Sequence, residues 1–175
     1  MDKQALWEKA VDFHGHECPG LTIGYRAALY AMELLELGFS KDEQVACIAE
    51  NDACGVDAIQ VLLGCSVGKG NLLFHMTGKQ AFSIYNRKTG KSVRLVLKPK
   101  QGMDRAQSFA YYHACPAEEM FDVKPATLEL PEHARMFDSY VCECCGETAG
   151  ANWIRLQGGK KLCVDCYRHY DRFHV

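Results

Sequence analysis

The sequence predicts an α+β protein in which helices pack on a small mixed or antiparallel sheet, followed by a small zinc finger of the treble-clef type. Three observations predict this fold class. Apolar residues at helical spacing follow Pro19 and Cys54, whereas short segments of alternating polarity are grouped between residues 71 and 97. Helices segregated from a small sheet are typical of α+β proteins. Two Cys-x-x-Cys pairs then follow near the C-terminus.

The N-terminal part of the chain predicts two helices. Residues 4–11 are expected to form the first one. Pro19 suits the first position of the second helix, and a residue before proline is pushed out of helical geometry, so we expect Cys18 at the N-cap. An apolar stripe continues this helix toward Gly38, a natural C-terminal stop.

Short strands follow. The expected elements, in order, are a strand over 45–50, a helix that begins after Cys54, strands over 71–77, 81–86 and 92–97, and a helix over 103–114. Residues 81–86 and 92–97 alternate in polarity around the turn segment RKTGK and predict a hairpin. Prolines and few large apolar residues between 121 and 131 place a domain boundary there. We therefore expect a core domain over 1–130 and a zinc-finger domain over 131–175.

Composition excludes several classes of protein. Of the 175 residues, 48% are hydrophobic and 24% are charged, so a packed core is expected. The net charge of −2 argues against a general polyanion binder. No apolar run approaches the roughly 18 residues of a membrane span, and we find no export signal at the N-terminus, so we expect a cytoplasmic protein with no membrane partner. Ten cysteines in a reduced compartment indicate metal binding or thiol chemistry rather than disulfides.

The two C-terminal cysteine pairs are the strongest signal in the chain. Cys142 and Cys145 are followed, after seventeen residues, by Cys163 and Cys166. Two such turns can direct four thiolates to one tetrahedral zinc, and four thiolates leave no position for a substrate, so the site is structural. A glycine pair predicts a hairpin between the two turns, and the segment CVDCYRHYDRF predicts a helix. Disulfides or a redox Cys-x-x-Cys are the alternatives, but a redox motif does not need two matched pairs.

The charge of this finger speaks against nucleic acid. Residues 139–175 contain five Lys or Arg and four Asp or Glu residues. Four thiolates on one divalent zinc add two further negative charges. Because nucleic-acid modules carry a clear basic excess, we expect no nucleic-acid partner and a role in folding or assembly.

The segment FHGHECPG predicts a second site. His14, His16 and Cys18 alternate, and positions two apart in an extended chain share a face. Cys18 and Cys54 each precede a helix, where the dipole and free N–H groups stabilise a thiolate. His16, Cys18 and Cys54 are therefore candidates for a three-ligand metal site with one open position, and for catalysis. In the alternative, the cysteines are small buried residues and the histidines cap loops.

The glycine-rich segment GCSVGKGN is not a phosphate loop. Gly64 and Gly68 are separated by three residues rather than four, and Gly70 stands where a phosphate loop has Ser or Thr. Lys69 remains a candidate for contact with an anionic ligand.

Three blocks, FHGHECPGLTIGYRAA, NDACGVDAIQVLLGCSVGKGNL and AFSIYNRKTG, together resemble the FmdE family, which is named after formylmethanofuran dehydrogenase. The resemblance covers about residues 5–120, and CECC and CVDC resemble the treble-clef finger that some members append. It implies an α+β core, an intertwined homodimer, and a link to a molybdenum or tungsten enzyme of one-carbon metabolism. Members of this family do not carry that enzyme's pterin or formyl-transfer chemistry.

The resemblance also implies a core site. It supports His16, Cys18 and Cys54, adds His14 and Cys65 as further candidates for a second metal of unknown identity, and maps polar cleft residues to Asp57, Gln60 and Lys69. Three functions remain open: a zinc-binding accessory, assembly or metal-sensing protein, which we favour; a metal- or thiol-dependent enzyme acting on a small one-carbon or sulfur substrate; and a regulator that uses the finger on nucleic acid. No reaction can be assigned from the sequence.

Overall fold

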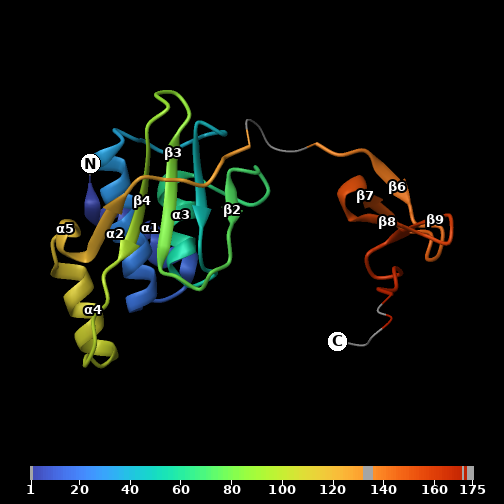
Figure 1. Cartoon of the computed structure of the whole chain (residues 1–175). Helices are drawn as coiled ribbons and strands as arrows, with labels where there is room; N and C mark the ends of the chain where they lie inside the picture. Colours follow the sequence, from blue (N-terminus) through green and yellow to red (C-terminus); the bar gives the residue numbers. More distant parts are fainter. Residues whose placement is uncertain (1, 132–135, 171, 173–175) are drawn as a thin grey trace. The chain divides into compact units, whose positions relative to one another are not determined.

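The computed structural model describes residues 2–131, 136–170 and 172. The chain divides into two compact units, Met1–Ala134 and Arg135–Val175 (Figure 1). No helix among the described residues has both the length and the apolar character needed to cross a bilayer.

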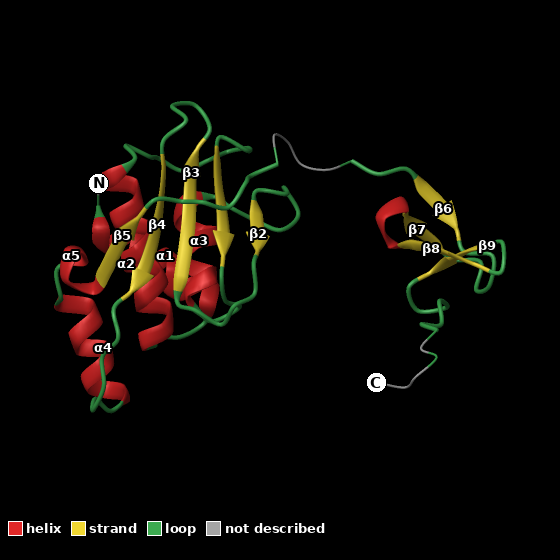
Figure 2. Ribbon diagram, viewed as in Figure 1, coloured by secondary structure: helices red, strands yellow, loops and turns green. Residues whose placement is uncertain are grey.

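The first unit is an α+β fold, as the sequence predicts. Its five strands are β1 (Val45–Ala49), β2 (Leu72–Phe74), β3 (Ala81–Asn86), β4 (Ser92–Leu97) and β5 (Phe121–Lys124). The sheet order is β2-β1-β3-β4-β5, and only the β1–β2 pair is parallel. The helices are α1 (Lys3–His14), α2 (Pro19–Leu34), α3 (Gly55–Leu63), α4 (Arg105–Ala114) and α5 (Ala117–Met120). Figure 2 shows α1, α2 and α3 on one face of the sheet.

The first two helices differ in length from the prediction. α1 continues to His14 and ends at Gly15, whose φ of 87° suits a left-handed C-cap. Cys18 is the N-cap of α2, as expected. This helix ends at Leu34 rather than near Gly38, because Glu36 takes a φ of 52° and the Leu37 N–H bonds back to the Met32 carbonyl at 2.9 Å. That bond closes the helix in the manner of a Schellman motif.

Glycines bring α2 and α3 into close contact. A β-carbon on Gly24 would lie 1.9 Å from the backbone oxygen of Gly55, and one on Gly55 would lie 3.0 Å from the Gly20 oxygen. Only residues without a side chain allow this backbone approach. As a result the N-terminal ends of the two helices, with Cys18 and Cys54, lie next to each other.

The strand β5 and the residues after it, as far as Pro131, belong to the first unit. β5 pairs antiparallel with β4. Beyond it, the Tyr85 hydroxyl donates to the Leu128 carbonyl at 2.7 Å, and the Arg87 guanidinium donates to the Pro131 carbonyl at 2.7 Å. The strand signal is weak because only Phe121 of β5 is buried, as befits an edge strand.

A buried ion pair anchors the end of β1. Arg94 donates from Nε to Oε1 of Glu50 at 2.5 Å and from its terminal nitrogen to Oε2 at 3.0 Å, and the Thr77 hydroxyl donates to Oε2 at 3.0 Å. The Glu50 side chain is 4% exposed. These bonds, led by the Arg94 hydrogen bond, hold the pKa of Glu50 below its ordinary value. The pair fixes the start of the loop that carries Cys54.

The second unit is built from short strands. These are β6 (Ser139–Val141) paired with β7 (Thr148–Gly150), the 3-10 turn η1 (Ala151–Trp153), and β8 (Ile154–Gln157) paired with β9 (Lys160–Cys163). The predicted hairpin around Gly158 and Gly159 is thus confirmed.

The helix predicted from Cys163 is not formed over residues 164–170. The chain makes one turn, in which the Tyr167 N–H donates to the Cys163 carbonyl at 2.9 Å. The Gln157 side chain then takes both backbone groups of Arg168, accepting from its N–H at 3.0 Å and donating to its carbonyl at 2.6 Å. Because a continued helix needs these groups, the Gln157 contacts compete with it.

Candidate functional site

Three side chains of the FHGHECPG segment converge in the first unit. The ligand atoms of His14, His16 and Cys18 all lie within 4.8 Å of one another, and the two imidazole rings are 4.5 Å apart between centroids. His14 comes from the last turn of α1 and Cys18 from the N-cap of α2, so the tight connection between these helices creates the cluster. Its exposure is graded: Cys18 is buried and His16 is exposed. Such a group of donors could hold a metal ion with one side open to ligand.

The His14 ring is held in one orientation by a carboxylate. Its Nδ1 lies 2.7 Å from Oδ2 of Asp57, and Gln60 donates to the other Asp57 oxygen at 3.2 Å. A proton on Nδ1 satisfies the carboxylate and leaves Nε2 with a free lone pair. Metal-binding histidines commonly have such a carboxylate partner on the ring nitrogen that does not bind the metal.

The free nitrogen of His14 faces the Cys18 sulfur. The distance from Nε2 to Sγ is 3.7 Å. Cys18 Sγ also accepts the Leu21 N–H at 3.2 Å, as an N-cap acceptor does. Zinc bonds of about 2.0–2.1 Å to nitrogen and about 2.3 Å to sulfur, at tetrahedral angles, place two such ligands roughly 3.6 Å apart. The separation therefore fits a shared metal ion.

Cys54 lies beside this cluster but outside the group of three. A β-carbon on Gly20 would lie 3.6 Å from Sγ of Cys54 and 3.8 Å from Sγ of Cys18, so the two thiols flank the same glycine. Burial, followed by the neighbouring Cys18 thiol, raises the pKa of Cys54. Its side chain makes no N-cap hydrogen bond to α3, in contrast to the expected parallel with Cys18.

A cavity opens beside the cluster. It has a volume of about 400 Å³, and its wall includes His14, Asp52, Cys54, Asp57 and Gln60. The structure thus places Asp57 and Gln60 at this cavity, where the family resemblance expects polar cleft residues. Sequence reasoning did not single out Asp52, although it stands two residues before Cys54 in the NDACG block.

Two sequence candidates lie elsewhere. Cys65 follows the other end of α3 in the hydrophobic core, where its thiol faces the Val45 carbonyl and burial raises its pKa to about 12. The Lys69 ammonium donates to the carbonyls of Ser40, at 3.1 Å, and Gly64. Lys69 therefore caps the C-terminal end of α3.

The second unit contains a cluster of four thiols. The Sγ atoms of Cys142, Cys145, Cys163 and Cys166 all lie within 4.8 Å of one another, and those of Cys145 and Cys163 are 3.9 Å apart. A tetrahedral site with bonds of about 2.3 Å requires sulfur separations of about 3.8 Å. Cys144 is exposed and not a member of the group. The predicted pairing of the two Cys-x-x-Cys turns is present in space, and the cluster fits a small zinc-binding module.

The backbone prepares one of these thiols for a metal. N–H groups of Cys145, Cys163 and Cys144 point at Cys142 and lower its pKa to about 6, and the Cys163 N–H lies 3.3 Å from the sulfur. Cys142 is buried, so this thiolate is stabilised by hydrogen bonds rather than by water. A thiolate is the form that binds metal.

The sequence matches a known protein family over more than half of its length. A family model described as "FmdE, Molybdenum formylmethanofuran dehydrogenase operon" matches residues 13–130, which include every residue of the core cluster. The chain belongs to the FmdE family. The resemblance expected from the three sequence blocks is thereby confirmed.

Two relatives add to this assignment. A protein of Archaeoglobus fulgidus, named probable S-adenosyl-L-methionine-binding protein, is 30% identical in an alignment of 204 positions that covers 93% of this chain and 52% of the relative. The FmdE-family chain thus spans about half the length of that protein. The crystal structure of a tungsten formylmethanofuran dehydrogenase FmdE-like protein from Syntrophus aciditrophicus superposes with a TM-score of 0.68 at 24% identity. The match covers 94% of this chain and 91% of that one, and it supports the fold alone.

Proposed function

We propose that this FmdE-family chain is a metal-binding accessory protein with two metal sites of different character. The core site holds a divalent transition metal on His14, His16 and Cys18, with Cys54 beside it, and keeps a position open toward the cavity. The C-terminal site holds zinc on four cysteines and maintains the fold of its unit.

The observation that carries the core proposal is the orientation of His14. Asp57 occupies Nδ1 at 2.7 Å, and Nε2 faces the Cys18 sulfur at 3.7 Å, close to the separation that a shared metal requires. A histidine that merely ends a helix needs neither the carboxylate nor the thiol. Two imidazoles and one thiolate suit zinc and neighbouring first-row metals.

The metal content of the full chain tests this proposal. Protein purified with zinc and dialysed is expected to retain two metals per chain by elemental analysis. His14→Gln combined with Cys18→Ser is expected to retain one, because the four-cysteine site is untouched. Lys41→Gln, on the exposed surface, should retain two. Two metals in the double variant would place the second metal elsewhere and refute the core site.

The proposed partners follow from the family. We propose that the chain forms a homodimer and serves a molybdenum or tungsten enzyme system. Sedimentation should then show a species of about twice the 19.6 kDa of one chain at micromolar concentration. A single species of the monomer mass would contradict the dimer.

A second candidate function is binding of S-adenosylmethionine, which the printed name of the Archaeoglobus fulgidus relative suggests. The cavity beside the core cluster supports it, because its Asp52 and Asp57 carboxylates could face a sulfonium and its Phe74 side chain offers a ring. Calorimetric titration tests this function. Binding of S-adenosylmethionine that Asp52→Asn weakens would favour it, and no heat at millimolar ligand would reject it.

A further inference from the structure

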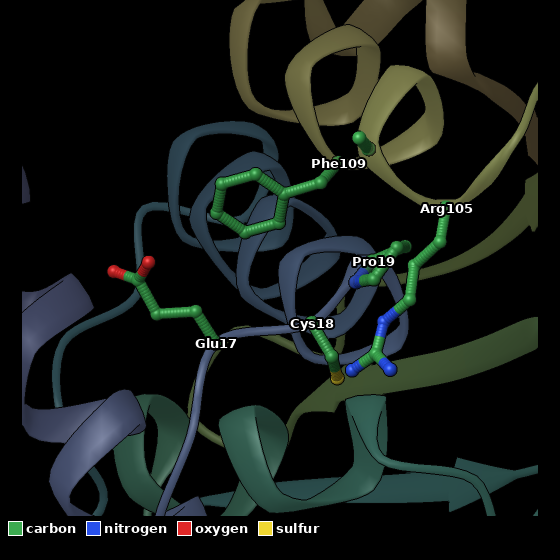
Figure 3. A pocket seen from close by; sticks show the side chains of 6 residues that line it. Glu17, Cys18, Pro19, Arg105 and Phe109 are labelled. Carbon is green, nitrogen blue, oxygen red and sulfur yellow. The ribbon is translucent and has the colours of Figure 1, made fainter.

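A second cavity, distinct from the one whose wall includes Asp57, lies against Cys18. We name it the Arg105 pocket. Its volume is about 340 Å³, and its walls are Glu17, Cys18, Pro19, Arg105, Ala106 and Phe109. The pocket joins the start of α2 to the first two turns of α4, two segments far apart in the sequence (Figure 3). This volume is at the small end of the range for ligand pockets, about 300–1,000 Å³.

Arg105 gives the pocket its charge. Figure 3 shows the guanidinium group of Arg105 turned toward the Cys18 sulfur. No carboxylate of the described part of the chain lies within ion-pair distance of it. The adjacent Asp104 is engaged in a capping box, in which its side chain accepts the Gln107 N–H at 2.8 Å.

Arg105 does not serve its own helix. It occupies the first position of α4, where the helix dipole favours anions and disfavours cations. Arg105 is exposed, so water solvates its charge, but the helix gains nothing from a cation at that position. An anion bound in the pocket would supply the missing partner.

The walls of the pocket other than Arg105 are mostly apolar and suit an apolar part of a ligand. The Phe109 ring is fixed by packing on Trp7, at 6.2 Å between centroids, and on His113, at 5.7 Å with an interplanar angle of 23°. Together with Pro19 and Ala106 it makes an apolar surface. The Trp7 indole donates to Glu17 at 3.1 Å, which holds that carboxylate away from Arg105 (Figure 3).

We propose that the Arg105 pocket binds a small carboxylate with an apolar body, whose carboxylate pairs with Arg105 next to Cys18 and whose body packs on Phe109. A planar guanidinium matches a carboxylate with two parallel hydrogen bonds. This inference rests on the proposed function in one respect: Cys18 is also a core metal ligand, so the bound anion lies beside the metal. It deepens that function by naming the class of ligand.

Binding of benzoate to the zinc-loaded full chain tests the inference. Benzoate is the probe because it combines a carboxylate with a flat apolar body, and saturation-transfer NMR detects weak binding. We expect saturable binding of benzoate, at least tenfold weaker binding of the neutral isostere benzamide, and at least tenfold weaker binding of benzoate to Arg105→Gln. Arg105→Lys should bind with intermediate affinity. Arg168→Gln, a matched change on an exposed arginine of the other unit, should bind as the unaltered chain does.

Several outcomes would overturn the inference. These are no binding of benzoate, equal binding of benzoate and benzamide, unchanged affinity in Arg105→Gln, or inorganic phosphate displacing benzoate with equal affinity, which would make the pocket a general oxyanion site. His14→Gln separates this inference from the proposed function, because His14 is a proposed metal ligand but not part of the pocket wall. Benzoate binding to His14→Gln that still depends on Arg105 would support the pocket without the core metal, whereas an unaltered chain that holds no core metal would refute the metal site alone.

Discussion

Gly24 of α2 and Gly55 of α3 meet so closely that a β-carbon on Gly24 would lie 1.9 Å from the Gly55 backbone oxygen. This contact sets the distance between the two helices, and with it the distance between the thiols of Cys18 and Cys54 at their N-terminal ends. The proposed core site thus depends on two residues that carry no functional group.

Replacing Gly24 by alanine should force the helices apart. Because the obstacle is backbone rather than a flexible side chain, we expect a loss of about 2–3 kcal/mol in the free energy of unfolding, measured by urea denaturation. Gly38→Ala is the control, since a β-carbon on Gly38 would meet nothing within 4 Å. Equal stability of the two variants would show that the helices are not in the described contact.

Removing the Asp57 carboxylate should weaken the core metal without removing a ligand. Asp57→Asn no longer fixes the His14 ring, and losses of this kind typically cost about 10- to 100-fold in metal affinity. Competition with a chromophoric chelator measures the affinity. Asp52→Asn is the matched control, because Asp52 lies in the same cavity wall but makes no bond to His14. A core affinity that is the same in both variants would argue against the role of Asp57.

The four-cysteine site should be needed for the fold of its unit. Cys163→Ser is expected to lose one zinc per chain and to expose the backbone of residues 139–166 to hydrogen exchange, because the binding energy of structural zinc is folding energy. Cys144→Ser changes a neighbouring exposed thiol outside the cluster and should lose neither. Zinc content that is unchanged in Cys163→Ser would refute the ligand assignment.

The Glu50–Arg94 pair predicts a pH dependence of stability. The folded pKa of Glu50 lies below its ordinary value of 4.5, chiefly because Arg94 donates to it. Its contribution is therefore fully present above about pH 4.5 and is lost as the pH falls through the lowered folded pKa. Glu50→Gln should cost about 3 kcal/mol at neutral pH, because it leaves the half-buried Arg94 without its charge partner.

Thermal unfolding across a pH series checks this prediction. The gap in Tm between the unaltered chain and Glu50→Gln should narrow below pH 4.5, whereas exposed Glu33→Gln should show little gap at any pH. A gap that stays constant down to about pH 3 would mean that Glu50 contributes through packing and not through its charge.

Local signals in the sequence predicted their part of the structure well. The spacing of the C-terminal cysteines predicts a cluster because each pair lies in one turn. Pro19, at the first position of α2, predicts Cys18 as the N-cap of that helix. The hairpin at Gly158 and Gly159 follows from turn chemistry alone. The helix predicted from Cys163 does not form over residues 164–170, because the side chain of Gln157 in β8 hydrogen-bonds to the backbone N–H and carbonyl of Arg168.

The core site was harder to predict because it depends on contacts between distant segments. The sequence ranks His14 below His16 as a candidate ligand. In the structure it is the His14 ring that a carboxylate orients, and that carboxylate, Asp57, lies 43 residues further along the chain. Cys54, a first candidate in the sequence, precedes α3 and lies beside the cluster, whereas Cys65, a weaker candidate, follows the other end of α3. The proximity of Cys18 and Cys54 depends on the packing of α2 against α3, which the pattern of one sequence does not specify.

Anomalous diffraction at the zinc edge, from crystals grown with zinc, tests the central claim most directly. The proposed function predicts two peaks per chain: one among the four C-terminal cysteines, and one between the imidazoles of His14 and His16 and the sulfur of Cys18. A single peak in the C-terminal unit, with none at the core cluster at saturating zinc, would contradict it.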